Sequence, residues 1–134
     1  MTPSHEDPPA DSGEYLVLSR GQWDADATPE AIQSAIDAFY PWLEAHIAAG
    51  RMKTGERLAR AGATVSRKAV LMDGPYGESK ELVGGYWFVL ADSLAAAGAL
   101  LSTSPTLAHG LFYEVRPLEF ERASAWRRGN ETPD

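Results

Sequence analysis

A single histidine, His109, is the residue in this sequence best suited to proton transfer. An unperturbed imidazole titrates close to neutral pH, and His109 lies between a helical segment and an expected strand, where it can face a cleft. Asp73 is placed to orient that imidazole or to act as a base. The two residues therefore predict a catalytic acid–base pair. The simpler alternatives are a hydrogen bond from His109 to loop backbone and an Asx-turn at Asp73, which precedes Gly74-Pro75.

Several polar and aromatic side chains are candidates for binding a small molecule. Arg116 can hold an anion, and Glu114 lies two positions before it, so both point to the same face of an expected strand. Their alternative role is a surface ion pair. The loop after Asp73 is charged, and such loops are usually solvated, while aromatic rings commonly pack in a core or a dimer interface. The expected ligand-binding residues are Tyr76, Lys80, Tyr86, Glu114 and Arg116.

The sequence contains no cysteine and no recognisable cofactor motif. Disulfides, thiolate catalysis and cysteine-bound metals are therefore excluded. The three histidines are scattered, and none is paired with a second ligand at helical spacing. Glycine fingerprints for dinucleotides, phosphate-binding loops and the Gly-x-Ser-x-Gly motif are absent. We expect no metal site and no cofactor.

The balance of charge is acidic, with 12 basic and 19 acidic residues and a net charge of −7. This balance disfavours nucleic acid and anionic membranes as partners, because both attract a basic surface. No stretch approaches the length of a membrane span, and residues 1–13 are polar and rich in proline rather than signal-like. We expect a cytoplasmic protein.

The pattern of apolar residues predicts one domain with the order β, α, two or three β, α, β. Thr28-Pro29 is a strong helix start and Gly50 a natural stop. Such an order indicates an α+β, ferredoxin-like sandwich, with two helices on one face of a mostly antiparallel sheet. Residues 1–13 are expected to be a disordered N-terminal tail, 14–118 the domain and 119–134 a C-terminal tail. The expected strands are 14–19, 51–58, 63–72 with a tight hairpin or bulge near Lys68, 86–90 and 111–118, and the helices are 29–49 and 94–103.

The strand that begins at Tyr86 is apolar on both faces. Tyr86, Phe88 and Leu90 point one way, and Trp87 and Val89 point the other. Helices can cover only one of these faces, so the other must meet a second sheet, a second subunit or a ligand. This argument predicts a homodimer.

Several spaced motifs resemble the YCII-related family, in particular its DGPF-motif branch. They are Asp73-Gly74-Pro75-Tyr76, Glu78-Ser79-Lys80-Glu81, the Gly84-Gly85 step before the aromatic run, and the late Pro105, His109-Gly110 and Glu114-Val115-Arg116-Pro117. The resemblance implies a dimeric α/β-barrel of unassigned biochemical function. It also suggests a link to sigma-factor regulation, because members of this branch are often encoded beside, or fused to, sigma factors.

The broader family is proposed to use a catalytic His–Asp pair, and this chain departs from it. Ser104 stands before Pro105, where the family's Asp would be, and Ala38, Phe39 and Tyr40 occupy the region of the family's His. The pair therefore does not carry over. Two hypotheses follow: a homodimeric module that binds a small molecule or a protein partner, or a small-metabolite enzyme that uses His109 and Asp73.

Overall fold

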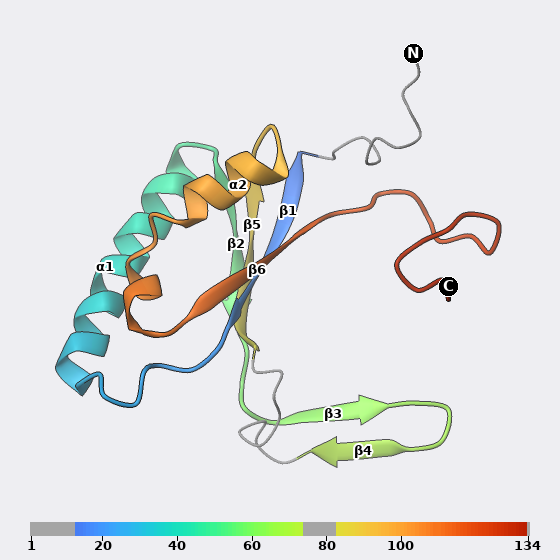
Figure 1. Cartoon of the computed structure of the whole chain (residues 1–134), viewed down its shortest axis with the longest axis horizontal. Coiled ribbons are helices and arrows are strands. Elements are labelled where there is room, and N and C mark those ends of the chain that lie inside the picture. The colour runs from blue at the N-terminus through green and yellow to red at the C-terminus, as the bar shows by residue number, and fades with distance from the viewer. Residues whose placement is uncertain (1–12, 74–82, 134) are drawn as a thin grey trace.

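Four strands form one antiparallel sheet in the order β2-β5-β1-β6. The computed structural model describes residues 13–73 and 83–133. The sheet contains β1 (Glu14–Arg20), β2 (Met52–Arg57), β5 (Val83–Leu90) and β6 (Phe112–Pro117). Two helices, α1 (Pro29–Ala48) and α2 (Leu94–Leu101), lie on one face of it, followed by the short 3₁₀ helix η2 (Pro105–His109) (Figure 1). This arrangement confirms the expected ferredoxin-like α+β fold.

Both helices begin at hydroxyl caps. The Thr28 hydroxyl accepts a hydrogen bond from the Ala31 N–H at 3.0 Å, and the Ser93 hydroxyl accepts one from the Ala96 N–H at 3.0 Å. The second helix ends two residues before the expected Thr103. The proline at 105 disfavours helical backbone just before it, and η2 starts there instead.

The hydrophobic core lies between the helices and the sheet. Alternate residues of β1 and β5 point into it, so Tyr15, Val17, Trp87 and Val89 are buried. The Trp87 ring packs edge-on against the rings of Phe39 on α1 and Tyr113 on β6. The expected alternation of the last strand is also confirmed, because Tyr113 and Val115 pack on this core.

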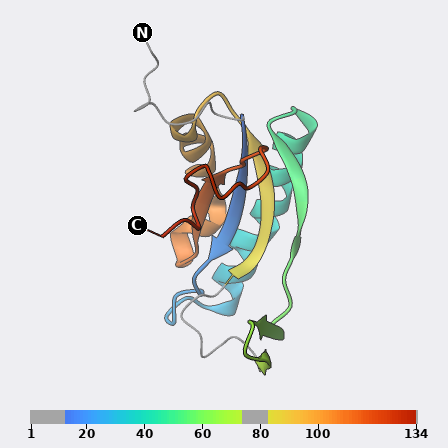
Figure 2. The same cartoon turned by 90° about the vertical axis from the view of Figure 1, so that its right-hand side faces the viewer.

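The opposite side of the sheet, here called the open face, has no helix over it, and Figure 2 views the molecule from that side. Leu16, Leu18, Tyr86, Phe88 and Leu90 lie on it and are only half-buried. Phe112 is 53% exposed. The sheet is thus apolar on both faces and covered by helices on one. The open face consists of Glu14, Leu16, Leu18, Arg20, Lys53, Glu56, Tyr86, Phe88, Leu90, Phe112, Glu114 and Arg116.

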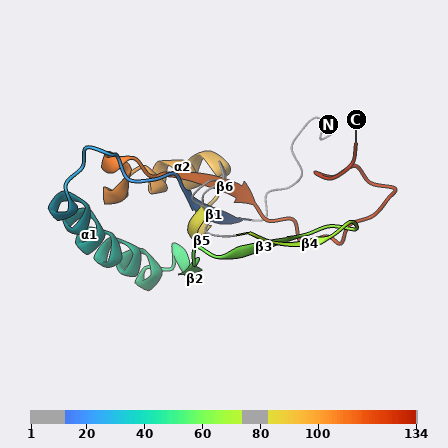
Figure 3. The same cartoon turned by 90° about the horizontal axis from the view of Figure 1, so that it is seen from below.

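A separate two-stranded hairpin, here called the arm, projects from the end of β2. It consists of β3 (Gly62–Val65) and β4 (Val70–Asp73), joined by a turn in which the Ser66 N–H donates to the Ala69 carbonyl at 2.9 Å. The hairpin expected near Lys68 is therefore confirmed. The arm extends on the side of the sheet away from the helices (Figures 1 and 3).

Candidate functional site

His109 is the last residue of η2, which packs against α1. Its carbonyl accepts a hydrogen bond from the Asp24 N–H at 2.8 Å. The next residue, Gly110, has a φ of +108°, and a Cβ there would lie 2.6 Å from the Asp24 carboxylate. The backbone of His109 is therefore held firmly. Within the described residues, no hydrogen bond is formed by its imidazole.

Asp73, the proposed partner of His109, ends β4 in the arm. The arm lies on the other side of the sheet from η2 and α1 in Figure 1. The Asp73 side chain lies outside the described residues, as do Tyr76 and Lys80. The catalytic pairing and these two ligand contacts stay predictions.

The other three expected ligand-binding residues, Tyr86, Glu114 and Arg116, come together on the open face. In the register of the sheet, Leu18 lies between Tyr86 on one side and Glu114 on the other. In the next row, Leu16 lies between Phe88 and Arg116. The Tyr86 and Phe88 rings meet edge to face, with centroids 6.0 Å apart.

Glu114 is shared between two guanidinium groups. One of its carboxylate oxygens accepts a hydrogen bond from Arg20, and the other accepts one from Arg116 at 3.3 Å. The Arg20 side chain is 17% exposed and the Arg116 side chain 50%. Sequence reasoning missed Arg20, although it continues the alternation of Leu16 and Leu18 onto the open face.

Arg116 is the cation on this face that is best placed to meet a ligand. A guanidinium group carries five N–H donors, and among the described residues Arg116 uses only one of them, in a hydrogen bond of 3.3 Å to Glu114. Its half-exposed fork matches a carboxylate or a phosphate. With the aromatic rings of the same face, it can recognise a molecule that has both an anionic group and an apolar part.

Comparison with protein families identifies the chain. The model of the YCII-related domain matches residues 13–121. The chain belongs to the YCII-related family. No curated protein matches it.

In this YCII-related domain, Ser104 is part of a buried cluster of three hydroxyl groups. The Tyr113 hydroxyl lies 2.7 Å from the Ser104 Oγ and 2.7 Å from the Thr106 Oγ1, and the latter two are 3.2 Å apart. Burial raises the pKa of Tyr113, and the hydrogen bonds to Ser104 and Thr106 oppose that rise. Each hydroxyl can donate one hydrogen bond and accept another, so the cluster satisfies itself and ties η2 to β6.

Replacing Tyr113 with phenylalanine is expected to lower the free energy of unfolding by about 1–2 kcal/mol, because it removes two buried hydrogen bonds while keeping the ring. Urea unfolding followed by circular dichroism measures the loss. Tyr86→Phe is the matched control, since no hydrogen bond from its hydroxyl is seen within the described residues. Equal losses of unfolding free energy in the two variants would show that the hydroxyl cluster contributes nothing to stability.

A second histidine, His46, lies at the end of α1, and its ring contacts two neighbouring side chains. Its Nδ1 accepts a hydrogen bond from the Arg51 Nε at 2.9 Å, and its ring packs edge-on against Trp42. Burial and the positive charge of Arg51 both lower the pKa of His46. The ring is therefore neutral at pH 7 and serves as a packed boundary residue.

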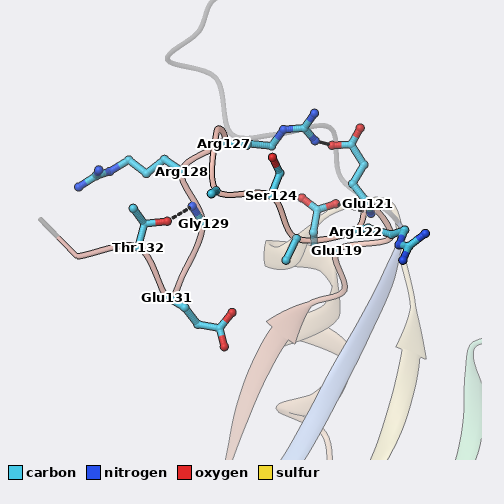
Figure 4. Close-up of a pocket in the computed structure, with 11 residues that line it drawn as sticks. Glu119, Glu121, Arg122, Ser124, Arg127, Arg128, Gly129, Glu131 and Thr132 are labelled. Atoms are coloured by element: carbon cyan, nitrogen blue, oxygen red, sulfur yellow. Dashed lines mark hydrogen bonds and ion pairs between the residues drawn. The ribbon is translucent and has the colours of Figure 1, made fainter.

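The segment after β6 folds around a pocket of about 360 Å³ (Figure 4). An ion pair between Arg127 and Glu121 and a hydrogen bond from the Gly129 N–H to Thr132 at 2.8 Å hold its wall. All of the lining residues are exposed, and none belongs to a helix or strand. None of the expected site residues lines this pocket.

Neither 13–73 nor 83–133 contains a helix with the length and apolar character needed to cross a membrane. In the same ranges, no three His, Asp or Glu side chains gather as they would around a metal ion.

Proposed function

We propose that this YCII-related domain is a homodimeric module that binds a small anionic molecule at the open face. The observation that carries this proposal is the composition of that face. It combines half-buried apolar and aromatic side chains with an arginine, Arg116, most of whose N–H donors have no partner among the described residues. Such a mixture is typical of small-molecule sites, in which apolar walls surround a few polar groups.

Dimerisation is supported by the apolar rows of β1 and β5. Leu16, Leu18 and Phe88 lie in the middle of the sheet and are only half-buried, because no helix or strand within residues 13–73 and 83–133 is stacked on this face. Packing two such faces together would bury these side chains, each of which contributes about 1.5–3 kcal/mol when it moves fully from water to a core. A second copy of the chain is always present in solution and can cover this apolar surface.

The ligand class follows from the charges that a second copy would cover. Removing water from the open face strengthens every charge interaction on it and makes an uncompensated guanidinium costly. Glu114 already serves both Arg20 and Arg116. A carboxylate or phosphate on the ligand would complete the partners of Arg116, and its apolar portion would lie near Tyr86 and Phe88.

The catalytic alternative rests on His109 and Asp73, and a regulatory link to sigma factors rests on the family resemblance alone. A module that binds a protein partner through the same face is the other form of the binding hypothesis. The small-molecule form is preferred because Arg116 and the aromatic rings offer a compact, chemically mixed site.

Replacing Arg116 with alanine is expected to weaken binding of an anionic aromatic probe by about ten- to a hundredfold, the equivalent of a charge-assisted hydrogen bond or two. Benzoate and phenyl phosphate are suitable probes, tested by thermal shift and calorimetry. Arg116→Lys should retain part of the affinity, because it keeps the charge but loses the fork.

Arg122→Ala in the C-terminal segment is the control for a general loss of positive charge. His109→Ala separates the binding and catalytic hypotheses: unchanged affinity would point away from His109. Binding that is equally strong in Arg116→Ala would contradict the proposed site.

A further inference from the structure

One face of the arm is wholly apolar and open to water. In the register of the hairpin, Val65 lies opposite Val70, and Ala63 lies opposite Met72, so these two pairs share one face. Val65 is 72% exposed, Val70 62% and Met72 79%. No strand, helix or loop of the described chain covers this face.

A hairpin of this kind needs a partner surface. An isolated two-stranded hairpin is marginally stable in water, and independent stability takes a third strand or packing on another element. The arm has four residues in each strand and none of its described side chains is buried. An exposed, continuous apolar face on it is therefore typical of an interaction surface.

The charge of the arm identifies the kind of partner. The arm and the segment that leads into it, residues 57–73, contain four basic residues and one acidic residue, Asp73, whereas the remainder of the chain has eight basic and eighteen acidic residues, a net charge of −10. A second copy of the same chain therefore offers an acidic surface of opposite sign, in addition to an apolar open face. Contact with such a partner would reduce the electrostatic repulsion between the basic side chains of the arm.

The root of the arm fixes its direction. The Leu58 N–H donates to the Gly84 carbonyl at 2.8 Å, and Arg57 pairs with Gly85. A Cβ at Gly55 would overlap the Tyr86 carbonyl, so glycine there allows β2 to approach β5 closely. Held in this way, the arm leaves its own domain on the side of the open face (Figure 3).

From these observations we propose that, in the homodimer, the arm of each copy packs its apolar face onto the partner copy beside the partner's open face. Ala63, Val65, Val70 and Met72 make the contact, and Arg67 and Lys68 at the tip of the arm meet acidic side chains of the partner. The inference rests on the homodimer of the proposed function. It adds that each copy contributes a segment to the surroundings of the other copy's site.

Photo-crosslinking from the arm tests the contact directly. The photoreactive amino acid benzoylphenylalanine replaces Val70, and nitrogen-15-labelled and unlabelled copies are mixed so that links between chains are distinguished by mass. We expect links between chains, mapped to residues of the partner. A dimer by light scattering without such links would overturn the arm contact and leave the proposed dimer standing. A monomer at micromolar concentration would overturn both.

A pair of neighbouring substitutions provides a second measurement. Val65→Asp places a carboxylate in the apolar face and should raise the dimer dissociation constant about tenfold or more. Ser66→Asp adds the same charge one residue later in the turn, where it can still accept from the Lys68 N–H as Ser66 does, and should raise the dissociation constant markedly less, because it leaves the apolar face intact. Equal dissociation constants for the two variants, or a DNA duplex that binds the arm while Val65→Asp leaves the dimer intact, would overturn the inference.

Discussion

Replacing Leu16 with glutamate is expected to convert the proposed homodimer into a folded monomer. Leu16 lies in the central strand β1, directly between Phe88 and Arg116 on the open face. In a single copy, the new carboxylate sits beside Arg116 and forms a favourable cross-strand pair. In a dimer, it must leave water together with Arg116, so that a buried ion pair with a large desolvation cost replaces an apolar contact. We expect the dissociation constant to rise by about a hundredfold, or 2.7 kcal/mol.

Light scattering at micromolar concentration and sedimentation equilibrium measure this change, and circular dichroism checks the fold. Leu94→Glu is the matched control. It makes the same chemical change at a leucine that is 46% exposed, at the start of α2 in the helix layer, where a negative charge is favoured. A wild-type monomer, or dissociation of both variants alike, would contradict the proposed dimer.

The fold could be predicted from the sequence because its signals are local. Thr28 and Ser93 each cap a helix within three residues, and the alternation of β5 and β6 assigns every side chain to one of two faces. Trp87 and Val89 could be assigned to one such face, and the helices bury it. Signals that act over a few residues of sequence can be interpreted without knowing which strands pair.

The candidate site could be predicted only in part, because it depends on pairing between distant strands. Glu114 and Arg116 share a face by their spacing alone, but Arg20 lies 94 residues before Glu114. Only the register of β1 against β6 brings these two together. No local pattern encodes that register, so Arg20 escaped notice.

The hydroxyl cluster was missed for a related reason. Ser104 precedes a proline and Thr106 follows it, and residues of this type are normally interpreted as turn and cap residues. Their role becomes visible only when β6 places the Tyr113 hydroxyl 2.7 Å from each of them. A strand tyrosine whose ring is in the core and whose hydroxyl must find a partner is the signal that could have indicated it.

Replacing Trp87 with alanine is expected to cost about 3–5 kcal/mol of unfolding free energy, the range for deleting a buried aromatic side chain. Trp87 is 5% exposed and contacts the rings of Phe39 and Tyr113, so it joins α1, β5 and β6. The whole free energy of unfolding of a domain of this size is about 5–15 kcal/mol. The variant should therefore unfold at far lower urea concentration, or fail to fold.

The measurement is best made in the Leu16→Glu background, because the proposed dimerisation would otherwise add a concentration-dependent contribution to apparent stability. Circular dichroism is the appropriate probe, since the substitution removes a fluorophore. Tyr86→Ala is the control from the same strand: its side chain is half-buried on the open face, and in a monomer its loss should be markedly smaller. Similar losses for Trp87→Ala and Tyr86→Ala would show that the helix-facing side of β5 is not the main core.

Trp87→Phe separates packing from hydrogen bonding at this position. The Trp87 indole N–H is buried without a hydrogen-bond partner in the described part of the chain. A buried, unpaired donor costs about 1–3 kcal/mol, so phenylalanine removes a penalty while it leaves a smaller cavity than alanine. The two effects oppose each other, and Trp87→Phe should lose about 1 kcal/mol or less. A loss as large as that of Trp87→Ala would mean that the indole N–H does have a partner in solution, and that this partner, rather than the ring contacts, accounts for the stability at this position.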